Sequence, residues 1–127
     1  MRELITHSRP RFWLYTAGPF LVGYGAEGLW DFANPLFLYG LLYFLFFANV
    51  YLYGVNDVFD LDTDVSKKRG PERSAAGRVK ALTVAAVASA AAGAPLAFDP
   101  AAASLLVLFL ALSAIYSAPP VRLKARP

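Results

Sequence analysis

The chain has 127 residues, of which 57% are hydrophobic and 17% are charged, with a net charge of +3 and no cysteine. A soluble domain has roughly 45–50% apolar and about 25% charged residues, and the lack of cysteine excludes disulfides and thiolate metal sites. No charged residue occurs from Phe32 to Asn56, and Asp99 is the only one from Ala81 to Val121. Apolar stretches of about 20 residues match the hydrocarbon core of a bilayer, so we expect an integral membrane protein.

Four membrane spans are predicted, and the expected fold class is an all-α membrane helical bundle. The first span covers residues 12–30 and contains several glycines and a proline, which membrane helices accept more readily than soluble ones. The second covers 35–55 and is rich in Leu, Phe and Tyr. The third, 79–98, is mostly Ala, a composition that also suits a buried soluble helix, and the fourth covers 101–118. We expect all 127 residues to form one domain.

The basic residues lie in three groups, before the first span, between the second and third, and after the fourth. With four spans these groups share one side of the membrane, and the opposite side carries Glu27, Asp31 and Asp99. The positive-inside rule then places both termini in the cytoplasm of a multi-pass protein, which we expect in the cell (inner) membrane. A secretory signal peptide over residues 1–30 is the alternative. Its apolar region would be unusually long, and no clear small-x-small cleavage site ends it.

The second span ends in an acidic segment. On a helix, Asp57, Asp60 and Asp64 fall within roughly 60° of one another, with Asn56 beside them and Asp62 on the opposite face. Three neighbouring carboxylates close to lipid repel one another, and hard oxygen ligands favour Mg²⁺ or Ca²⁺ over zinc. The four residues on the shared face are therefore the predicted metal ligands, and the three aspartates among them the predicted catalytic residues. A solvated helix end is the alternative, although the helix dipole disfavours acids there.

Basic and hydroxyl residues follow on the same side of the membrane. Charged side chains near a metal-held diphosphate would bind its terminal phosphate. Their positions also agree with a basic cytoplasmic loop and an interfacial tyrosine, which is the alternative interpretation. The predicted diphosphate-binding set is Asn56, Lys68, Arg73, Tyr116, Arg122 and Lys124.

The segment Asn56-Asp57-x-x-Asp60-x-x-x-Asp64 resembles the first aspartate-rich motif of the UbiA superfamily of intramembrane prenyltransferases. Residues 8–13, 68–73 and 116–124 are also similar to that family, and the opening and the motif most resemble its lycopene elongase branch. The resemblance implies Mg²⁺-dependent transfer of a prenyl group from a prenyl diphosphate to a lipophilic acceptor, such as an aromatic ring, a quinone precursor or a carotenoid. It implies that the motif residues hold Mg²⁺ and diphosphate, and that the cations contacting phosphate are Lys68, Arg73, Arg122 and Lys124.

The chain departs from that family in length. The family's fold has about nine helices and a second aspartate-rich motif, whereas this sequence has four predicted spans and no second cluster. We therefore expect the N-terminal part, about half, of such a fold, inactive by itself, within the lipid bilayer and completed by a longer chain or a second polypeptide. The alternative is an inactive fragment or subunit that packs with partner helices. A CDP-alcohol phosphatidyltransferase is disfavoured because Leu61 stands where its pattern has Gly, and no nucleic-acid partner is expected.

Overall fold

The computed structural model describes residues 5, 8–28, 31–65 and 72–119, and for 61–65 and 72–77 it describes the backbone alone. Within those residues every regular element is helical, which confirms the predicted all-α fold class. The elements in chain order are η1 (Pro10–Phe12), α2 (Trp13–Ala26), α3 (Pro35–Leu42), η2 (Tyr43–Phe47), α4 (Ala48–Val65), α5 (Glu72–Ala91), η3 (Ala94–Leu96) and α6 (Pro100–Ser117).

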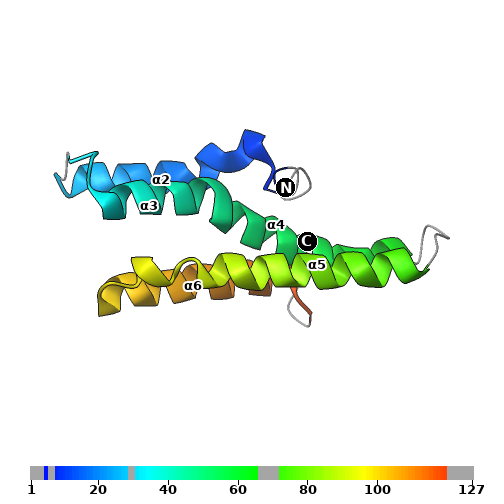
Figure 1. Cartoon of the computed structure of the whole chain (residues 1–127). Coiled ribbons are helices and arrows are strands. Elements are labelled where there is room, and N and C mark those ends of the chain that lie inside the picture. Colours follow the sequence, from blue (N-terminus) through cyan, green and yellow to red (C-terminus); the bar gives the residue numbers. More distant parts are fainter. Residues whose placement is uncertain (1–4, 6–7, 29–30, 66–71, 120–127) are drawn as a thin grey trace, which may run out of the picture.

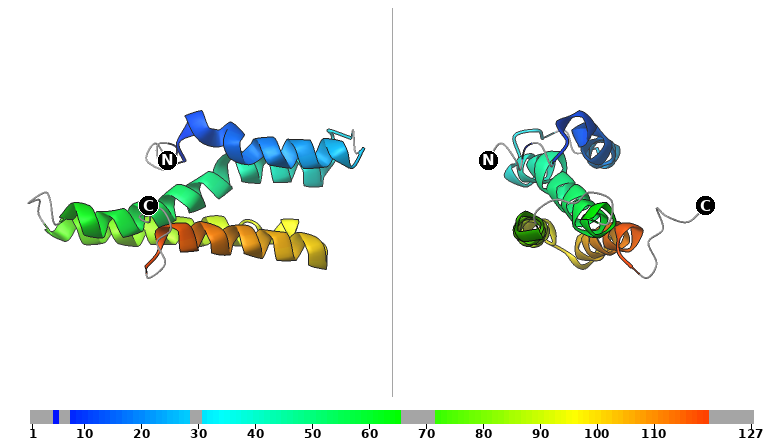
Figure 2. Two further views of the ribbon diagram at one scale, coloured as in Figure 1. Left: turned by 180° about the vertical axis from the view of Figure 1, so that it is seen from behind. Right: turned by 90° about the vertical axis from the view of Figure 1, so that its right-hand side faces the viewer.

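The helices pack around α4. Figure 1 shows α2 and α3 side by side, with α4 continuing from α3 and crossing towards α5 and α6. The end view in Figure 2 places α4 between α2 on one side and α5 and α6 on the other. The α2–α3 turn and η3 lie at one end of the bundle, and the end of α4 and the start of α5 lie at the other. With α3, η2 and α4 taken as one span, successive spans therefore alternate in direction, as membrane spans joined by short connections must.

Three helical segments in the described part of the chain are long and apolar enough to cross a membrane. They are Pro35–Asp60, Arg78–Leu96 and Pro100–Ser117. The remaining helix, α2, has 14 residues, contains Pro19 and is preceded by the single turn η1. At about 1.5 Å per residue, α2 alone is shorter than the hydrocarbon core of a bilayer, so a fourth span needs η1 and the residues that flank these two elements.

Two helices begin with the same capping arrangement, which the sequence spells as a polar residue followed by proline. Asn34 Oδ1 accepts hydrogen bonds from the backbone N–H groups two and three residues later, at 2.8 and 3.4 Å, and Pro35 takes the first helical position. Asp99 does the same for α6 at 2.8 and 2.9 Å, ahead of Pro100. The side-chain oxygen satisfies orphan donors, and proline has no donor to satisfy. The isolated acid Asp99 is therefore a helix cap.

A wide π-helical turn, η2, joins α3 to α4 in the middle of the second span. Such turns loosen the backbone ladder locally. The fully buried Asn49 donates through Nδ2 to the carbonyl oxygens of Phe44 and Leu45, at 3.0 Å each. Thr16 of α2 donates to the same Phe44 oxygen at 2.6 Å and accepts from Asn49 Nδ2 at 2.6 Å. This polar cluster fastens α2 to the second span.

Small residues and tyrosines set the packing on the other side of α4. A Cβ added at Gly54 would meet the Cβ of Ala86 at 3.6 Å, so this glycine lets α4 and α5 approach closely, as small residues do in membrane bundles. Tyr39 donates to a backbone carbonyl at the end of α5 at 2.5 Å. Tyr51 donates to a backbone carbonyl of α6 at 2.8 Å. These contacts hold the end of α5 and the middle of α6 against the second span.

Candidate functional site

The acidic segment is helical throughout, because α4 continues to Val65 without a break. We call Asn56, Asp57, Asp60 and Asp64 the acidic stripe. The spacing of these residues places them on one side of α4. The side chains of the first three are described, whereas for Asp64 the structure gives the backbone position alone.

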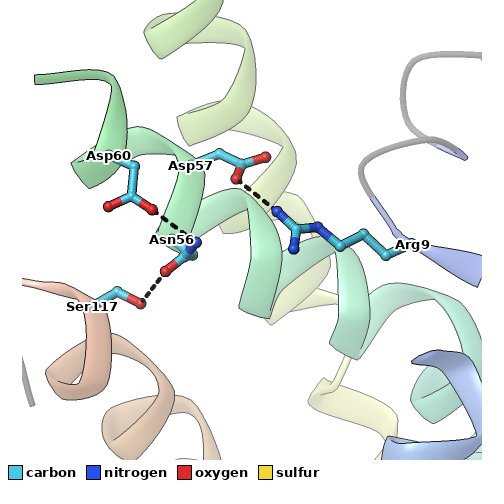
Figure 3. Close-up of polar contacts among 5 residues, drawn as sticks. All are labelled: Arg9, Asn56, Asp57, Asp60 and Ser117. Atoms are coloured by element: carbon cyan, nitrogen blue, oxygen red, sulfur yellow. Dashed lines mark hydrogen bonds and ion pairs between the residues drawn. The ribbon is translucent and has the colours of Figure 1, made fainter. Parts of the chain in front are cut away.

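Asn56 lies at the centre of a hydrogen-bonded chain that joins α4 to α6. Its Nδ2 donates to Asp60 Oδ2 at 3.0 Å, one helical turn further on. Its Oδ1 accepts from the hydroxyl of Ser117 at 3.2 Å, and Ser117 is 1% exposed (Figure 3). The end of α6 thus orients the amide, and the amide in turn orients the carboxylate of Asp60.

Asp57 meets a cation from the opposite direction. Arg9 Nη2 lies 3.4 Å from Asp57 Oδ1, with the two side chains 42% and 23% exposed. The Arg9 guanidinium carbon also lies 4.5 Å from the ring centroid of Tyr53, one turn before Asp57 on α4. A partly exposed ion pair and an exposed cation–π contact each contribute about 1 kcal/mol or less. These contacts matter for position more than for stability, because they place a guanidinium beside the acidic stripe.

Residues 8–13, which we call the N-terminal arm, position Arg9 beside α4. Trp13 Nε1 donates to the backbone oxygen and the hydroxyl of Ser8, at 3.1 and 3.0 Å, and Ser8 is fully buried. Arg9 has φ 48° and ψ 72°, and it is the only non-glycine residue with positive φ in the described part of the chain. That conformation costs an L-residue about 1–2 kcal/mol. Such outliers persist where surrounding contacts impose them, and here the arm's contacts with α4 do so.

The predicted diphosphate-binding residues divide by position. Tyr116 lies in the last turn of α6 and is half exposed, and it is its neighbour Ser117 that reaches the acidic stripe. Arg73 lies in the first turn of α5, where the backbone alone is described. Lys68, Arg122 and Lys124 lie outside the described residues, so their phosphate contacts stay predictions.

The described side chains fit a hard divalent cation that is held by few protein ligands. No group of three His, Cys, Asp or Glu side chains that could hold a metal ion occurs among them. The oxygens that such a cation could use belong to Asp60, which accepts from the Asn56 amide nitrogen, and to Asn56, whose Oδ1 accepts from Ser117. Mg²⁺ typically takes one or two carboxylates and fills its other positions with water and substrate phosphate. This donor set agrees with such a cation and lacks the nitrogen and sulfur ligands typical of zinc.

An apolar groove of about 260 Å³ runs between α4 and α5. Its lining on α4 comes largely from the side of the helix opposite the acidic stripe. The groove is therefore separate from the polar site. Its lining residues are Tyr51, Val55, Val58, Phe59, Thr83, Ala86, Val87 and Ala90.

Two residues of this site, Arg9 and Ser117, were not predicted. Arg9 was interpreted only as one of several basic residues that mark the cytoplasmic side before the first span. Ser117 was not predicted because its neighbour Tyr116 was taken as the hydroxyl that binds diphosphate. A run of charge or polarity near a span does not say which member turns inwards, because that depends on where the helix ends.

A family model and several related proteins of known name match this chain, and they agree with one another. The UbiA prenyltransferase family matches residues 16–127. A lycopene elongase/hydratase of Halobacterium salinarum is 44% identical over 131 residues, covering 99% of this chain and 48% of the relative. The Haloarcula japonica protein of the same name is 44% identical, covering 98% and 44%. That of Corynebacterium glutamicum is 33% identical over 137 residues, covering 100% and 46%. The chain thus spans about half the length of these relatives, and no solved structure matches significantly.

Proposed function

The chain belongs to the UbiA prenyltransferase family, and we propose that it forms the N-terminal part of a Mg²⁺-dependent enzyme that transfers a prenyl group to a lipophilic acceptor. The names of its relatives favour a carotenoid as that acceptor. The observation that carries the proposal is the Asn56–Asp60 pair, tied to α6 by Ser117 at the end of a membrane-spanning helix. The chain spans about half the length of these relatives, so the complete activity is proposed for the protein of which these residues form a part.

In this proposal the acidic stripe holds the diphosphate end of the substrate through the metal. Asn56, Asp60 and Asp64 are the proposed ligands, and Mg²⁺ supplies positive charge that stabilises the departing diphosphate. The Ser117 hydroxyl keeps the amide oxygen of Asn56 in a fixed direction. The proposed phosphate contacts are those of Lys68, Arg73, Arg122 and Lys124, which stabilise the same negative charge as it develops.

The reaction balances without a redox partner. The bond between the first prenyl carbon and the diphosphate oxygen breaks, and its electron pair leaves with the diphosphate. A carbon–carbon double bond of the acceptor donates its electron pair to the allylic cation, and the acceptor then loses a proton. Apolar surroundings keep water away from the cation. The described residues around the site agree with this, because aromatic side chains such as Tyr53 and Phe12 flank it on the side of α2.

We also propose an orientation for the protein. Both termini and the α4–α5 connection face the cytoplasm, and the α2–α3 turn and η3 face the opposite side. The charge distribution supports this, because every Lys and Arg then lies on the cytoplasmic side. The acidic stripe accordingly opens towards the cytoplasm, where water-soluble Mg²⁺ is available to it.

The central test is the binding of a non-hydrolysable prenyl diphosphate analogue in the presence of Mg²⁺. Asp60→Ala removes a carboxylate from the acidic stripe, and we expect it to lower affinity for the analogue by at least about tenfold. Asp62→Ala is the matched control, because residue 62 lies on the opposite side of the helix by its spacing. Binding is measured by isothermal titration of protein in nanodiscs. Equal losses from both changes would contradict the one-sided arrangement of the site.

A second test asks whether prenyl transfer needs residues that correspond to the rest of the relatives' length. The chain is expressed alone and together with the C-terminal half of the Halobacterium salinarum relative as a separate polypeptide. Prenyl transfer that appears only in the co-expressed sample supports a split or longer enzyme. If the two polypeptides purify together and bind the analogue but transfer nothing, the chain is a membrane subunit without catalytic activity, which is the alternative function.

A further inference from the structure

Asp57 differs from the rest of the acidic stripe in the direction of its contacts. Figure 3 shows its carboxylate turned towards Arg9, while Asp60 turns towards Asn56 and the end of α6. The ion pair to Arg9 joins α4 to the N-terminal arm, whereas the bonds of Asn56 join α4 to α6. The same part of α4 thus contacts the N-terminal arm through Asp57 and α6 through Asn56.

The N-terminal arm is bent onto α4 at several points. The Phe12 and Tyr53 rings lie 6.0 Å apart between centroids, and the Arg9 guanidinium lies over the same Tyr53 ring. Behind this contact, the indole of Trp13 is bonded to the buried Ser8. Arg9 has a left-handed backbone conformation at this point, and its side chain reaches Asp57 and Tyr53 of α4. The position of the arm therefore depends on the ion pair between Arg9 and Asp57.

We propose that Asp57 is a positioning residue that clamps the N-terminal arm to the acidic stripe through Arg9, and that metal binding falls to Asn56, Asp60 and Asp64. If Asp57 also bound the metal, Arg9 would have to leave it or lie against a divalent cation of like charge. With the pair intact, the guanidinium stays beside the stripe as a fixed positive charge for the diphosphate. The metal-binding half of this inference rests on the proposed function, whereas the clamp stands on the contacts alone.

The experiment follows the arm and the metal separately in the same protein. The chain has two tryptophans, so Trp30→Phe leaves Trp13, inside the arm, as the only indole. Quenching of its fluorescence by acrylamide reports how far the arm is exposed. Mn²⁺ in place of Mg²⁺ reports metal affinity by electron paramagnetic resonance. Both measurements are made on the protein in nanodiscs.

Four variants in that background separate the roles. Asp57→Asn and Arg9→Gln are expected to raise the quenching constant of Trp13 equally, and each to change Mn²⁺ affinity less than about fivefold, because a partly exposed pair contributes little. Asp60→Asn is expected to lower Mn²⁺ affinity at least about tenfold and to leave quenching unchanged. Arg11→Gln is the matched control in the same arm, since Arg11 stacks on Phe12 at 4.7 Å and is exposed. It should change neither measurement.

The charge-exchanged double variant, Arg9→Asp with Asp57→Arg, should restore low quenching if the ion pair is the clamp. The inference is overturned if Asp57→Asn weakens Mn²⁺ binding as much as Asp60→Asn does, or if it leaves Trp13 quenching unchanged. Failure of the proposed function looks different: the parent protein would then bind neither Mn²⁺ nor the diphosphate analogue. In that case the quenching results alone would decide whether the clamp exists.

Discussion

Replacing Asn49 by leucine should destabilise the protein markedly, although Asn49 lies about two helical turns before the acidic stripe on α4. Its Nδ2 contacts Leu45 O and Phe44 O at 3.0 Å and Thr16 Oγ1 at 2.6 Å. Leucine has similar bulk and no donor, so Asn49→Leu removes the hydrogen bonds and leaves little cavity. Phe44 O keeps the Thr16 hydroxyl as a donor, and Leu45 O loses its side-chain donor. The change therefore concerns hydrogen bonding more than packing.

The expected cost follows from the number of bonds. The bond to Thr16 joins two helices, and such bonds contribute about 0.6 kcal/mol on average and up to about 1.7 kcal/mol. Together with the two bonds to carbonyls of the same span, its loss should lower the free energy of unfolding by about 1–3 kcal/mol. Ser113→Ala is the matched control. Ser113 is also buried but bonds a carbonyl of its own helix, at 2.7 Å. Its loss should cost less than about 0.5 kcal/mol.

The assay is equilibrium unfolding in mixed micelles as the fraction of denaturing detergent increases, followed by circular dichroism. Thr16→Val, alone and combined with Asn49→Leu, completes a double-mutant cycle. Because the two residues bond each other and share Phe44 O, their effects should fail to add by about 0.5 kcal/mol or more. An Asn49→Leu protein as stable as the Ser113→Ala protein would refute the conclusion that the polar cluster of Asn49 and Thr16 fastens α2 to the second span.

The remaining stability predictions concern helix contacts and caps. Gly40→Ala should lower the free energy of unfolding by about 1–3 kcal/mol through overpacking, because a Cβ there would meet Phe20 Cζ at 2.5 Å. Gly18→Ala is its control in the same unfolding assay. Nothing lies within 4 Å of the Cβ added at Gly18, so this change should be neutral or slightly stabilising. Asp99→Ala should cost about 1 kcal/mol by removing the cap of α6, with Asp99→Asn retaining most of the stability. A destabilised Gly18→Ala protein, or a neutral Asp99→Ala protein, would contradict these contacts.

Much of the architecture could be predicted from the sequence, because membrane helices are recognised by the length of their apolar stretches and by the charges between them. The spacing of Asp57, Asp60 and Asp64 predicted a helical acidic segment, and α4 is helical to Val65. The caps were also within reach, since Asn34 and Asp99 each precede a proline that begins a helix. Reading Asp99 as an isolated acid overlooked this local pattern.

The tertiary contacts of the site were out of reach, for a physical reason. A buried polar residue such as Asn49 inside an apolar span is a visible signal, but its partners are backbone carbonyls exposed by a π-helical turn, which has no sequence signature. Arg9 is one of three arginines before α2, all equally explained by topology. Its left-handed backbone and its contacts with Asp57 and Tyr53 set it apart from the neighbouring Arg11, and these features depend on how the arm packs against α4.

The orientation of the protein can be tested with the chain's own composition. It contains no cysteine, so single cysteines introduced at chosen positions are labelled without background. Ala33, exposed at the α2–α3 turn, and Ala97, exposed after η3, lie at one end of the bundle, and Ala118 lies where α6 ends. With both termini in the cytoplasm, a membrane-impermeant maleimide added to intact cells should label the Ala33→Cys and Ala97→Cys proteins. It should label Ala118→Cys only after the membrane is permeabilised, and the reverse pattern would place the acidic stripe on the outer side, away from cytoplasmic Mg²⁺ and diphosphate.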